Sequence, residues 1–238
     1  MIIDYYRVMK TRSITLLSFL IFIGNALSQG YKYDRVLNYE LSNKPDSVKN
    51  YFDEVCVANR TSSLFRYSRW EKDVYIFLCI EDSTMKDSIL HEVRDLILEL
   101  NSLINPITIY LTEDISKMTT FAVVGSFDYF NEMSLKYNQN WKLYDDGKTG
   151  GLNNCRGNME NIDYSYFFVN SPKTNSYCYN FTKHVLVEEL VQSLGFPNDS
   201  WAHVNSIFYD GFIPYGSPTT LSELDKEVIN ILYNENVK

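Results

Sequence analysis

The chain has 238 residues, which is enough for one ordinary domain with its own hydrophobic core, whereas two domains would be cramped. Its composition, 45% hydrophobic with 19 Tyr and 14 Phe, is that of a soluble folded protein and argues against a disordered one. The formal net charge of −8 argues against binding to nucleic acid or anionic lipid, because both attract basic surfaces and the sequence has no basic cluster.

The N-terminus has the layout of a secretory signal peptide. Basic residues precede the apolar run 14–24, and the small residues Ala26 and Ser28 follow it at the positions that a signal peptidase reads. We therefore expect residues 1–28 to be cleaved and the protein to be secreted, periplasmic or attached to the cell surface. The apolar run is short for a transmembrane helix, so no stable membrane span is expected after cleavage, with an uncleaved anchor as the alternative.

The four cysteines fit an exported protein, in which an even number usually means disulfide bonds. We favour a bridge between Cys155 and Cys178, because the segment between them ends just before a predicted helix and the bridge would tie a loop to its start. Cys56 and Cys79 would then form a second bridge, and two buried free thiols are the alternative. The sequence has no CxxC pair, which argues against a zinc ribbon.

After the signal peptide, the hydrophobic pattern predicts both helices and strands. In chain order these are a short helix over 45–57, a strand over 74–80, a helix over 86–103, strands over 107–111, 120–125 and 164–170, a central helix over 182–194 and a last helix over 221–234. This order predicts an α+β domain in which helices cover a mixed, twisted sheet.

The remaining regions are less regular. Residues 131–161 are rich in Asn, Gly, Lys and Asp, so we expect a long irregular excursion there, with room for one short helix. Residues 29–63 are expected to form an N-terminal extension that contains the first helix. Residues 64–238 are then predicted to be a single domain, since the sequence has no internal repeat and no low-complexity linker.

The central helix is amphipathic, with an unusual polar side. At about 100° per residue, the apolar residues between 186 and 194 lie on one side of the helix. Glu188, Glu189 and Gln192 lie together on the other side. Gly195 ends the helix where a left-handed conformation is needed, and the proline two residues later prevents its continuation.

The same segment has the spacing of the zinc-protease motif HExxHxxGxxH. In that motif two histidines one turn apart bind one ion, the glutamate activates a water molecule, and a third ligand follows the glycine turn. Here the glutamate and the glycine are present as Glu189 and Gly195. The three histidine positions are occupied by Glu188, Gln192 and Asn198.

These residues, followed by the segments 206–210 and 221–233, resemble a secreted family catalogued as domain of unknown function 2927. That family in turn resembles the metzincin branch of zinc peptidases with altered ligands. The resemblance is specific over 178–235 and weaker over 64–177. It implies a zincin-like, metzincin-like single domain that contains the central helix 182–194 and the C-terminal helix 221–234.

The last part of this resemblance concerns the chain after the third ligand position. Metzincins place a methionine beneath the metal at this point and then enter a last helix. Here Ser206, Ile207 and Phe208 occupy the turn, and no Met follows position 159. The last helix remains, and Ser222 can cap it together with Asp225.

The ligand chemistry argues against a catalytic zinc ion, which prefers imidazole or thiolate ligands, so we expect no bound cofactor. Calcium is an alternative to no metal, because Glu188, Glu189, Asn198 and Asp199 all offer oxygen atoms. The plainest interpretation is a polar network, in which Gln192 and Asn198 bond the carboxylates and the turn after the helix. A solvent-facing acidic surface without function is the other interpretation.

We therefore expect an exported zincin-like domain without peptidase activity, whose degenerate cleft has a structural role or binds an unknown protein or peptide. The alternative is a metal-dependent hydrolase of unusual chemistry. In that case Glu189 would be the general base, and Glu188, His203 and an amide would hold the metal. A surface-attached adhesion component is a third class, which no motif supports.

Overall fold

The computed structural model describes residues 43–56, 68–146, 149–157, 161–171, 178–210 and 217–233. All but Asn43 belong to one compact unit that extends from Lys44 to Asn236. The expected signal peptide and most of the expected extension lie outside the described residues. Among the helices that are described, none has the length and hydrophobicity needed to cross a membrane.

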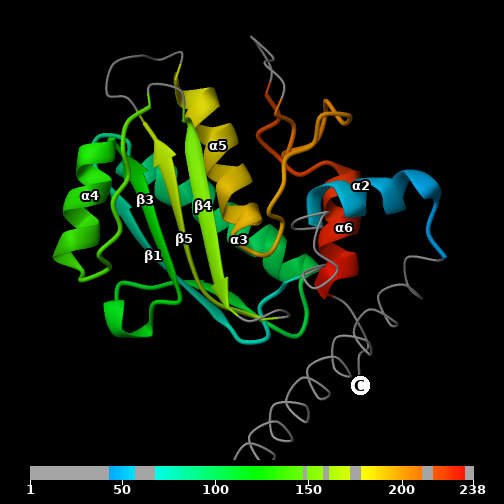
Figure 1. The fold of residues 1–238 in the computed structure, drawn as a ribbon, viewed down its shortest axis with the longest axis horizontal. Coiled ribbons are helices and arrows are strands. Elements are labelled where there is room, and N and C mark those ends of the chain that lie inside the picture. Colours follow the sequence, from blue (N-terminus) through cyan, green and yellow to red (C-terminus); the bar gives the residue numbers. More distant parts are fainter. Residues whose placement is uncertain are drawn as a thin grey trace, which may run out of the picture. The chain divides into compact units, whose positions relative to one another are not determined.

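The core of the unit is a mixed five-stranded sheet (Figure 1). Its strands are β1 (Val74–Ile80), β2 (Ile109–Leu111), β3 (Thr120–Gly125), β4 (Gly151–Gly157) and β5 (Ile162–Asn170). They lie in the order β2-β1-β3-β5-β4, in which all neighbours are parallel except β4 and β5. The predicted mixed sheet is thus confirmed, and β4 is the antiparallel strand at one edge.

The described residues also form five α-helices. They are α2 (Asp46–Cys56), α3 (Lys86–Leu103), α4 (Phe127–Lys136), α5 (Cys178–Gln192) and α6 (Glu223–Tyr233). Figure 1 shows α4 on one face of the sheet and α3 and α5 on the other. The helix α2 packs against α6, and α6 also contacts α3. The predicted α+β class is therefore confirmed.

Successive side chains along the strands point to opposite faces of the sheet, so a separate hydrophobic core forms on each face. On the α4 face, Phe121 of β3 lies beside its β5 partner Tyr166 and contacts Phe130 of α4 in an aromatic cluster. Trp141, which follows α4, stacks on Tyr166 with the ring centroids 4.5 Å apart. This cluster buries one side of the sheet without using α5.

The opposite face receives the apolar side of α5. The five apolar residues predicted to face the sheet are all buried: Leu186, Val187, Leu190, Val191 and Leu194. An ion pair of 2.7 Å between Lys183 and Glu92 links α5 to α3. The predicted orientation of the central helix is therefore confirmed.

The predicted irregular region 131–161 is more regular than expected. Its start belongs to α4, which Ser126 caps by accepting a hydrogen bond from the backbone N–H of Tyr129. Its later part contains β4, whose sequence GLNNCRG has neither β-branched nor aromatic residues. The prediction missed this strand because an edge strand with polar residues has no alternating hydrophobic pattern.

Candidate functional site

The polar side of α5 faces protein and not solvent. The helix packs against β4 and β5, so its polar side is enclosed by the edge strand and by the chain that follows Gly195. Glu189 and Gln192 are only 6% and 5% exposed. The interpretation of this side as a solvent-facing acidic surface is therefore wrong for these two residues.

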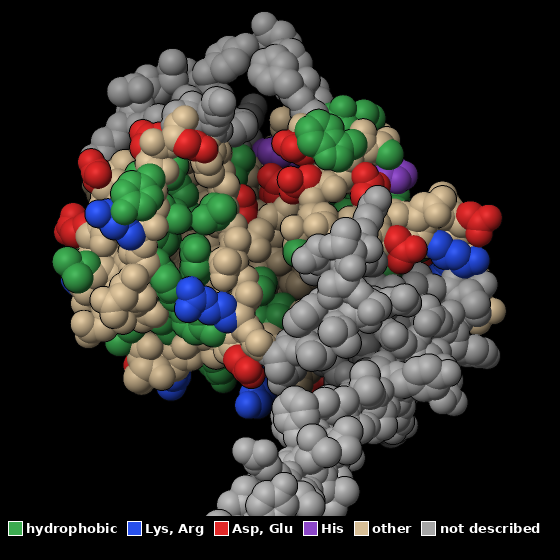
Figure 2. Space-filling model, in the orientation of Figure 1, with side chains coloured by type: hydrophobic (Ala, Val, Ile, Leu, Met, Phe, Trp, Pro, Cys, Tyr) green, Lys and Arg blue, Asp and Glu red, His purple; other side chains and the backbone are tan. Residues whose placement is uncertain are grey.

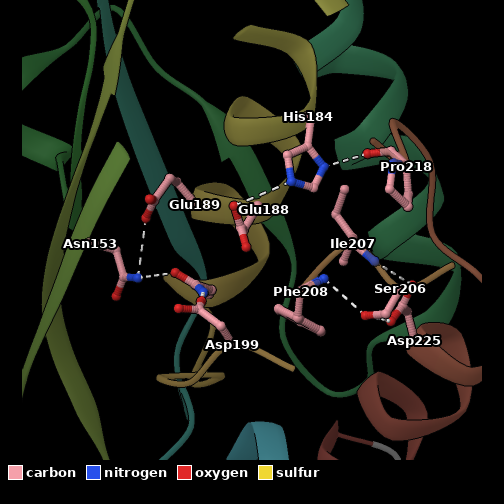
Figure 3. Close-up of polar contacts among 11 residues, drawn as sticks. Asn153, His184, Glu188, Glu189, Asp199, Ser206, Ile207, Phe208, Pro218 and Asp225 are labelled. Atoms are coloured by element: carbon pink, nitrogen blue, oxygen red, sulfur yellow. Dashed lines mark hydrogen bonds and ion pairs between the residues drawn. The ribbon is translucent and has the colours of Figure 1, made fainter. Parts of the chain in front are cut away.

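A residue of the edge strand completes this side. Asn153 lies opposite Phe167 in the β4–β5 ladder, and its side chain points to α5 (Figure 3). Its Nδ2 atom donates to Glu189 Oε2 at 3.2 Å and to Gln192 Oε1. The Nε2 atom of Gln192 donates to Asp199 Oδ1 at 2.7 Å. Both ends of the Gln192 amide are thus bonded, and the predicted polar network exists at this residue.

We define the α5 polar site as Asn153, His184, Glu188, Glu189, Gln192 and Asp199. Figure 2 shows Asp and Glu side chains gathered in the middle of one face of the molecule, with a histidine beside them. The approach of α5 to β4 at this site is very close. A Cβ atom at Gly151 would lie 2.3 Å from Glu189 Oε1 and 2.4 Å from Val185 Cγ1. Only glycine fits here, because any larger side chain would push the Glu189 carboxyl away from its place.

His184 and Glu188 form a pair one helical turn apart. The Nδ1–H group of His184 donates to the carbonyl of Pro218 at 2.6 Å, so the Nε2 atom faces Glu188 Oε2 at 3.7 Å. Burial lowers the pKa of His184, although the bond to the carbonyl opposes this shift. Burial, helped by the charges of Glu189, Asp199 and Asp210, raises the pKa of Glu188 to about 9. The two groups therefore face each other in their neutral forms at neutral pH, and the contact is not an ion pair.

Glu189 also holds its proton more strongly than an ordinary glutamic acid. Burial raises its pKa to about 8, the bond from Asn153 opposes the shift, and the charge of Asp199 adds to it. Glu188 and Glu189 are therefore both mostly protonated at neutral pH. Such a site has less negative charge than its sequence suggests.

Asn198, the third position of the motif, contacts a different part of the molecule. Its Nδ2 atom donates to the backbone carbonyl of Glu54 at 3.0 Å, and its backbone N–H donates to the carbonyl of Val55 at 3.3 Å. Both acceptors belong to α2. The residue thus anchors the chain after α5 to the first helix of the unit, a link that the sequence did not predict.

The turn between α5 and Asn198 requires a glycine. Gly195 has a φ angle of 113°, and a Cβ atom there would lie 2.1 Å from the backbone oxygen of Ser68. The predicted left-handed residue is confirmed, and the sharp turn directs the following chain back toward α2.

A second polar network lies around Asp225, which is fully buried in α6. Its Oδ1 atom accepts hydrogen bonds from the hydroxyls of Tyr51 and Ser206, and its Oδ2 atom accepts from the backbone N–H groups of Ile207 and Ser222. The Ser222 hydroxyl in turn accepts from the N–H of Asp225 at 3.1 Å. The predicted cap of the last helix is confirmed, and Tyr51 of α2 is an additional partner.

The turn 206–208 is packed with aromatic side chains. Phe208 is fully buried and stacks on Phe196 with the ring centroids 5.5 Å apart. Its backbone N–H donates to the Ser206 hydroxyl at 2.9 Å. An apolar core therefore fills the position at which the resemblance to metzincins would place a methionine.

The cysteines whose side chains are described are free thiols. Cys56 and Cys79 are buried and unpaired, which supports the alternative of two free thiols over a second bridge. Cys155 is also free, and burial, with the charge of Glu189, raises its pKa to about 12. The side chain of Cys178 lies outside the described residues, and because Cys155 is a free thiol, the structure does not show the favoured bridge between them.

The donor set of the α5 polar site does not fit zinc. At the three positions of the motif it offers one carboxyl that favours its proton and two neutral amides, and the amide of Gln192 is already bonded. Elsewhere in the described part of the chain, no three His, Cys, Asp or Glu side chains are grouped so that they could hold a metal ion. The expected absence of a cofactor stays a prediction.

Together, these features define a mixed α+β domain whose central helix turns a hydrogen-bonded polar side toward an edge strand. Residues 46–238 match a family model described as "Protein of unknown function (DUF2927)", so the chain belongs to this family. The match includes α2 and confirms the family that the sequence motifs indicated. Comparison with curated proteins gave no match.

Proposed function

We propose that this chain is an exported, zincin-like domain without peptidase activity, in which the α5 polar site has a structural role and supports binding of a protein or peptide. The observation that carries this proposal is the bonding of Gln192. Its amide occupies the position of the second histidine of the motif, and both of its ends are used by Asn153 and Asp199. The one atom of this amide that could ligate a metal, Oε1, already accepts from Asn153, so a metal ion would have to compete with that bond.

The zincin-like part of the proposal has support from the order of the elements after β5. A helix with the spaced motif, a left-handed glycine turn, a buried turn at 206–208 and a capped last helix follow one another, as the sequence resemblance implies. Export has support from the sequence of residues 1–28 alone.

One observation favours the alternative of a hydrolase. The pKa of Glu189 is raised to about 8, and a general base works best when its pKa is near the operating pH. However, the residue is buried, bonded by Asn153 and closed in by Gly151. His203, the other proposed ligand, packs its ring against Tyr51 at a centroid distance of 4.6 Å. The geometry therefore supports the non-catalytic function better.

The test combines metal analysis with a peptide-library cleavage assay on the purified mature protein and on the Glu189→Gln variant. We expect no stoichiometric metal, and no cleavage above the background that both proteins share. Cleavage by the wild type that disappears in Glu189→Gln, with a melting temperature no lower than that of the wild type, would overturn the proposal, because this substitution removes a base but keeps the shape.

A further inference from the structure

A stretch of the chain around the α5 polar site is strongly one-sided in charge. Between Lys183 and Lys226 the sequence contains no Lys or Arg, whereas it contains six acidic residues. Glu188 and Glu189 favour their protonated forms and Asp225 is fully buried, so the acidic groups that face solvent are Asp199, Asp210 and Glu223. Asp210 lies close enough to raise the pKa values of Asp199 and Glu188. This part of the molecule therefore attracts cationic groups and repels anionic ones.

The same stretch displays apolar side chains to solvent. We define the 197–210 loop as residues 197–210, which follow the Gly195 turn. Within it, Trp201 is 70% exposed and Val204 is 51% exposed. Tryptophan is one of the side chains that most often contribute a large share of the binding energy of a protein interface. Figure 2 shows hydrophobic side chains directly beside acidic ones on this part of the surface.

The backbone of the 197–210 loop is fixed by hydrogen bonds at several points. The N–H of Trp201 donates to Glu54 Oε1 at 2.9 Å. The N–H of Ser200 donates to the carbonyl of Phe208 at 2.6 Å, and the N–H of Asp210 donates back to Ser200 at 3.1 Å. An exposed tryptophan on a fixed backbone binds with a smaller loss of entropy than one on a flexible chain.

The position of Trp201 also brings acidic groups to it from two elements. Glu54 comes from α2 and bonds the tryptophan backbone, whereas Asp199 and Asp210 come from the loop itself. A partner segment that packs on the indole ring would therefore have carboxylates next to it. Carboxylates form their strongest hydrogen bonds with the guanidinium group of Arg and the ammonium group of Lys.

We propose that the 197–210 loop is an interaction surface for a cationic segment of a partner protein, in which an aliphatic side chain covers Trp201 and neighbouring Arg or Lys side chains meet the acidic groups. This inference rests on the proposed function, since it names the partner class of that non-catalytic site. A membrane surface is disfavoured, because the same carboxylates repel anionic lipid.

The probe is a fluorescently labelled peptide of alternating Leu and Arg, with two matched peptides in which Glu replaces Arg or Gly replaces Leu. Binding is measured by fluorescence anisotropy at low and high salt. We expect saturable binding of the Leu/Arg peptide, weakened by salt because the exposed charges are screened. The Leu/Glu peptide should not bind, and the Gly/Arg peptide should bind at least about tenfold more weakly.

Two variants assign the binding to the loop. Trp201→Ala should weaken binding of the Leu/Arg peptide at least about tenfold, and Asp210→Asn should weaken it severalfold and reduce its salt dependence. Tyr144→Ala is the matched control, because Tyr144 is 74% exposed and lies in the segment after α4. It should leave the affinity unchanged, and all three variants should keep the wild-type melting temperature.

The inference would be overturned if the Leu/Arg peptide did not bind, or if the Leu/Glu or the Gly/Arg peptide bound equally well. It would also be overturned if Trp201→Ala did not weaken binding of the Leu/Arg peptide. Binding to phosphatidylserine vesicles that depends on Trp201 would overturn it in favour of a membrane surface. The peptides are also analysed by mass spectrometry. Their cleavage would contradict the proposed function, whereas intact but unbound peptides would contradict only the inference drawn from the loop.

Discussion

The Nε2 atom of Gln192 lies 2.7 Å from the Oδ1 atom of Asp199, and this hydrogen bond joins α5 to the chain beyond the Gly195 turn. Because the other end of the amide accepts from Asn153, a single side chain connects the helix, the edge strand and the 197–210 loop. The position that would bind a metal in the zinc-protease motif is here a junction of three segments.

Gln192→Ala should therefore destabilise the protein. The substitution removes the hydrogen bonds that Asn153 and Asp199 make to this side chain, and each such bond contributes about 1 kcal/mol. In a domain of this size, 1 kcal/mol lowers Tm by about 2–4 °C, so we expect a decrease of several degrees in a thermal unfolding experiment. Asn205→Ala, an exposed change in the loop, is the control and should shift Tm very little.

The protonated carboxyls of the α5 polar site predict a stability that falls as the pH rises. The pKa values of Glu188 and Glu189 are about 9 and 8 in the folded protein, against a usual value near 4.5. Between about pH 4.5 and pH 8 the unfolded chain releases protons that the folded chain keeps, so the free energy of unfolding decreases with rising pH. Urea unfolding at about pH 5 and about pH 8 measures this difference.

Glu189→Gln should reduce this pH dependence, because the amide is neutral at every pH and mimics the protonated acid. We expect the variant to exceed the wild type in free energy of unfolding by about 1 kcal/mol or more at about pH 8, with a smaller gain at about pH 5. Glu132→Gln changes an exposed carboxyl on α4 and is the matched control. A wild type that is more stable at pH 8 than at pH 5 would contradict the assignment.

Gly195→Ala should be among the most damaging single changes in the molecule. Alanine is strained at a φ angle of 113°, and its Cβ atom would lie 2.1 Å from the backbone oxygen of Ser68. The strain alone costs about 1–3 kcal/mol, and the backbone contact adds to it. Soluble yield and Tm should both fall, and a variant with wild-type Tm would show that the turn has another conformation.

The hydroxyl of Tyr51 should stabilise the fold through Asp225. Tyr51→Phe keeps the ring and removes one donor to the buried carboxylate, so we expect a loss of about 1–2 kcal/mol in free energy of unfolding. Tyr110→Phe, on an exposed tyrosine of β2, is the control and should be near neutral.

A double-mutant cycle tests whether the two residues act together. Asp225→Asn should destabilise the protein, because the amide cannot accept all four of the bonds that the carboxylate receives. The double variant with Tyr51→Phe should lose less than the sum of the two single losses. Strict additivity would mean that the hydroxyl and the carboxylate contribute independently.

The parts of the fold that could be predicted from the sequence are those that depend on residues close together in the chain. The bounds of α3 and β3 agree with the predicted ranges. The apolar residues of α3 recur every three or four positions, and β3 is a short continuous apolar run of the kind that forms a buried parallel strand. The cap between Ser222 and Asp225 was also predictable, since its two members are three residues apart.

The partners of the α5 polar site could not be predicted in the same way. A helical projection groups Glu188, Glu189 and Gln192 on one side, but it contains no information on what lies opposite. Asn153 comes from a strand that has no strand-like pattern, and its contact with Gln192 spans 39 positions of the sequence. The raised pKa values follow from this enclosure, and so they also required the three-dimensional arrangement.

The network around Asp225 ties α6 to α2. Tyr51 in α2 and Asp225 in α6 are 174 positions apart in the sequence, and the turn at 206–208 is held between them. Shortening the protein at either end, by starting after α2 or stopping before α6, should therefore release this turn and the Trp201 surface that precedes it. A fragment made for binding or crystallisation studies needs to keep both helices, however far each of them lies along the chain from the residues under study.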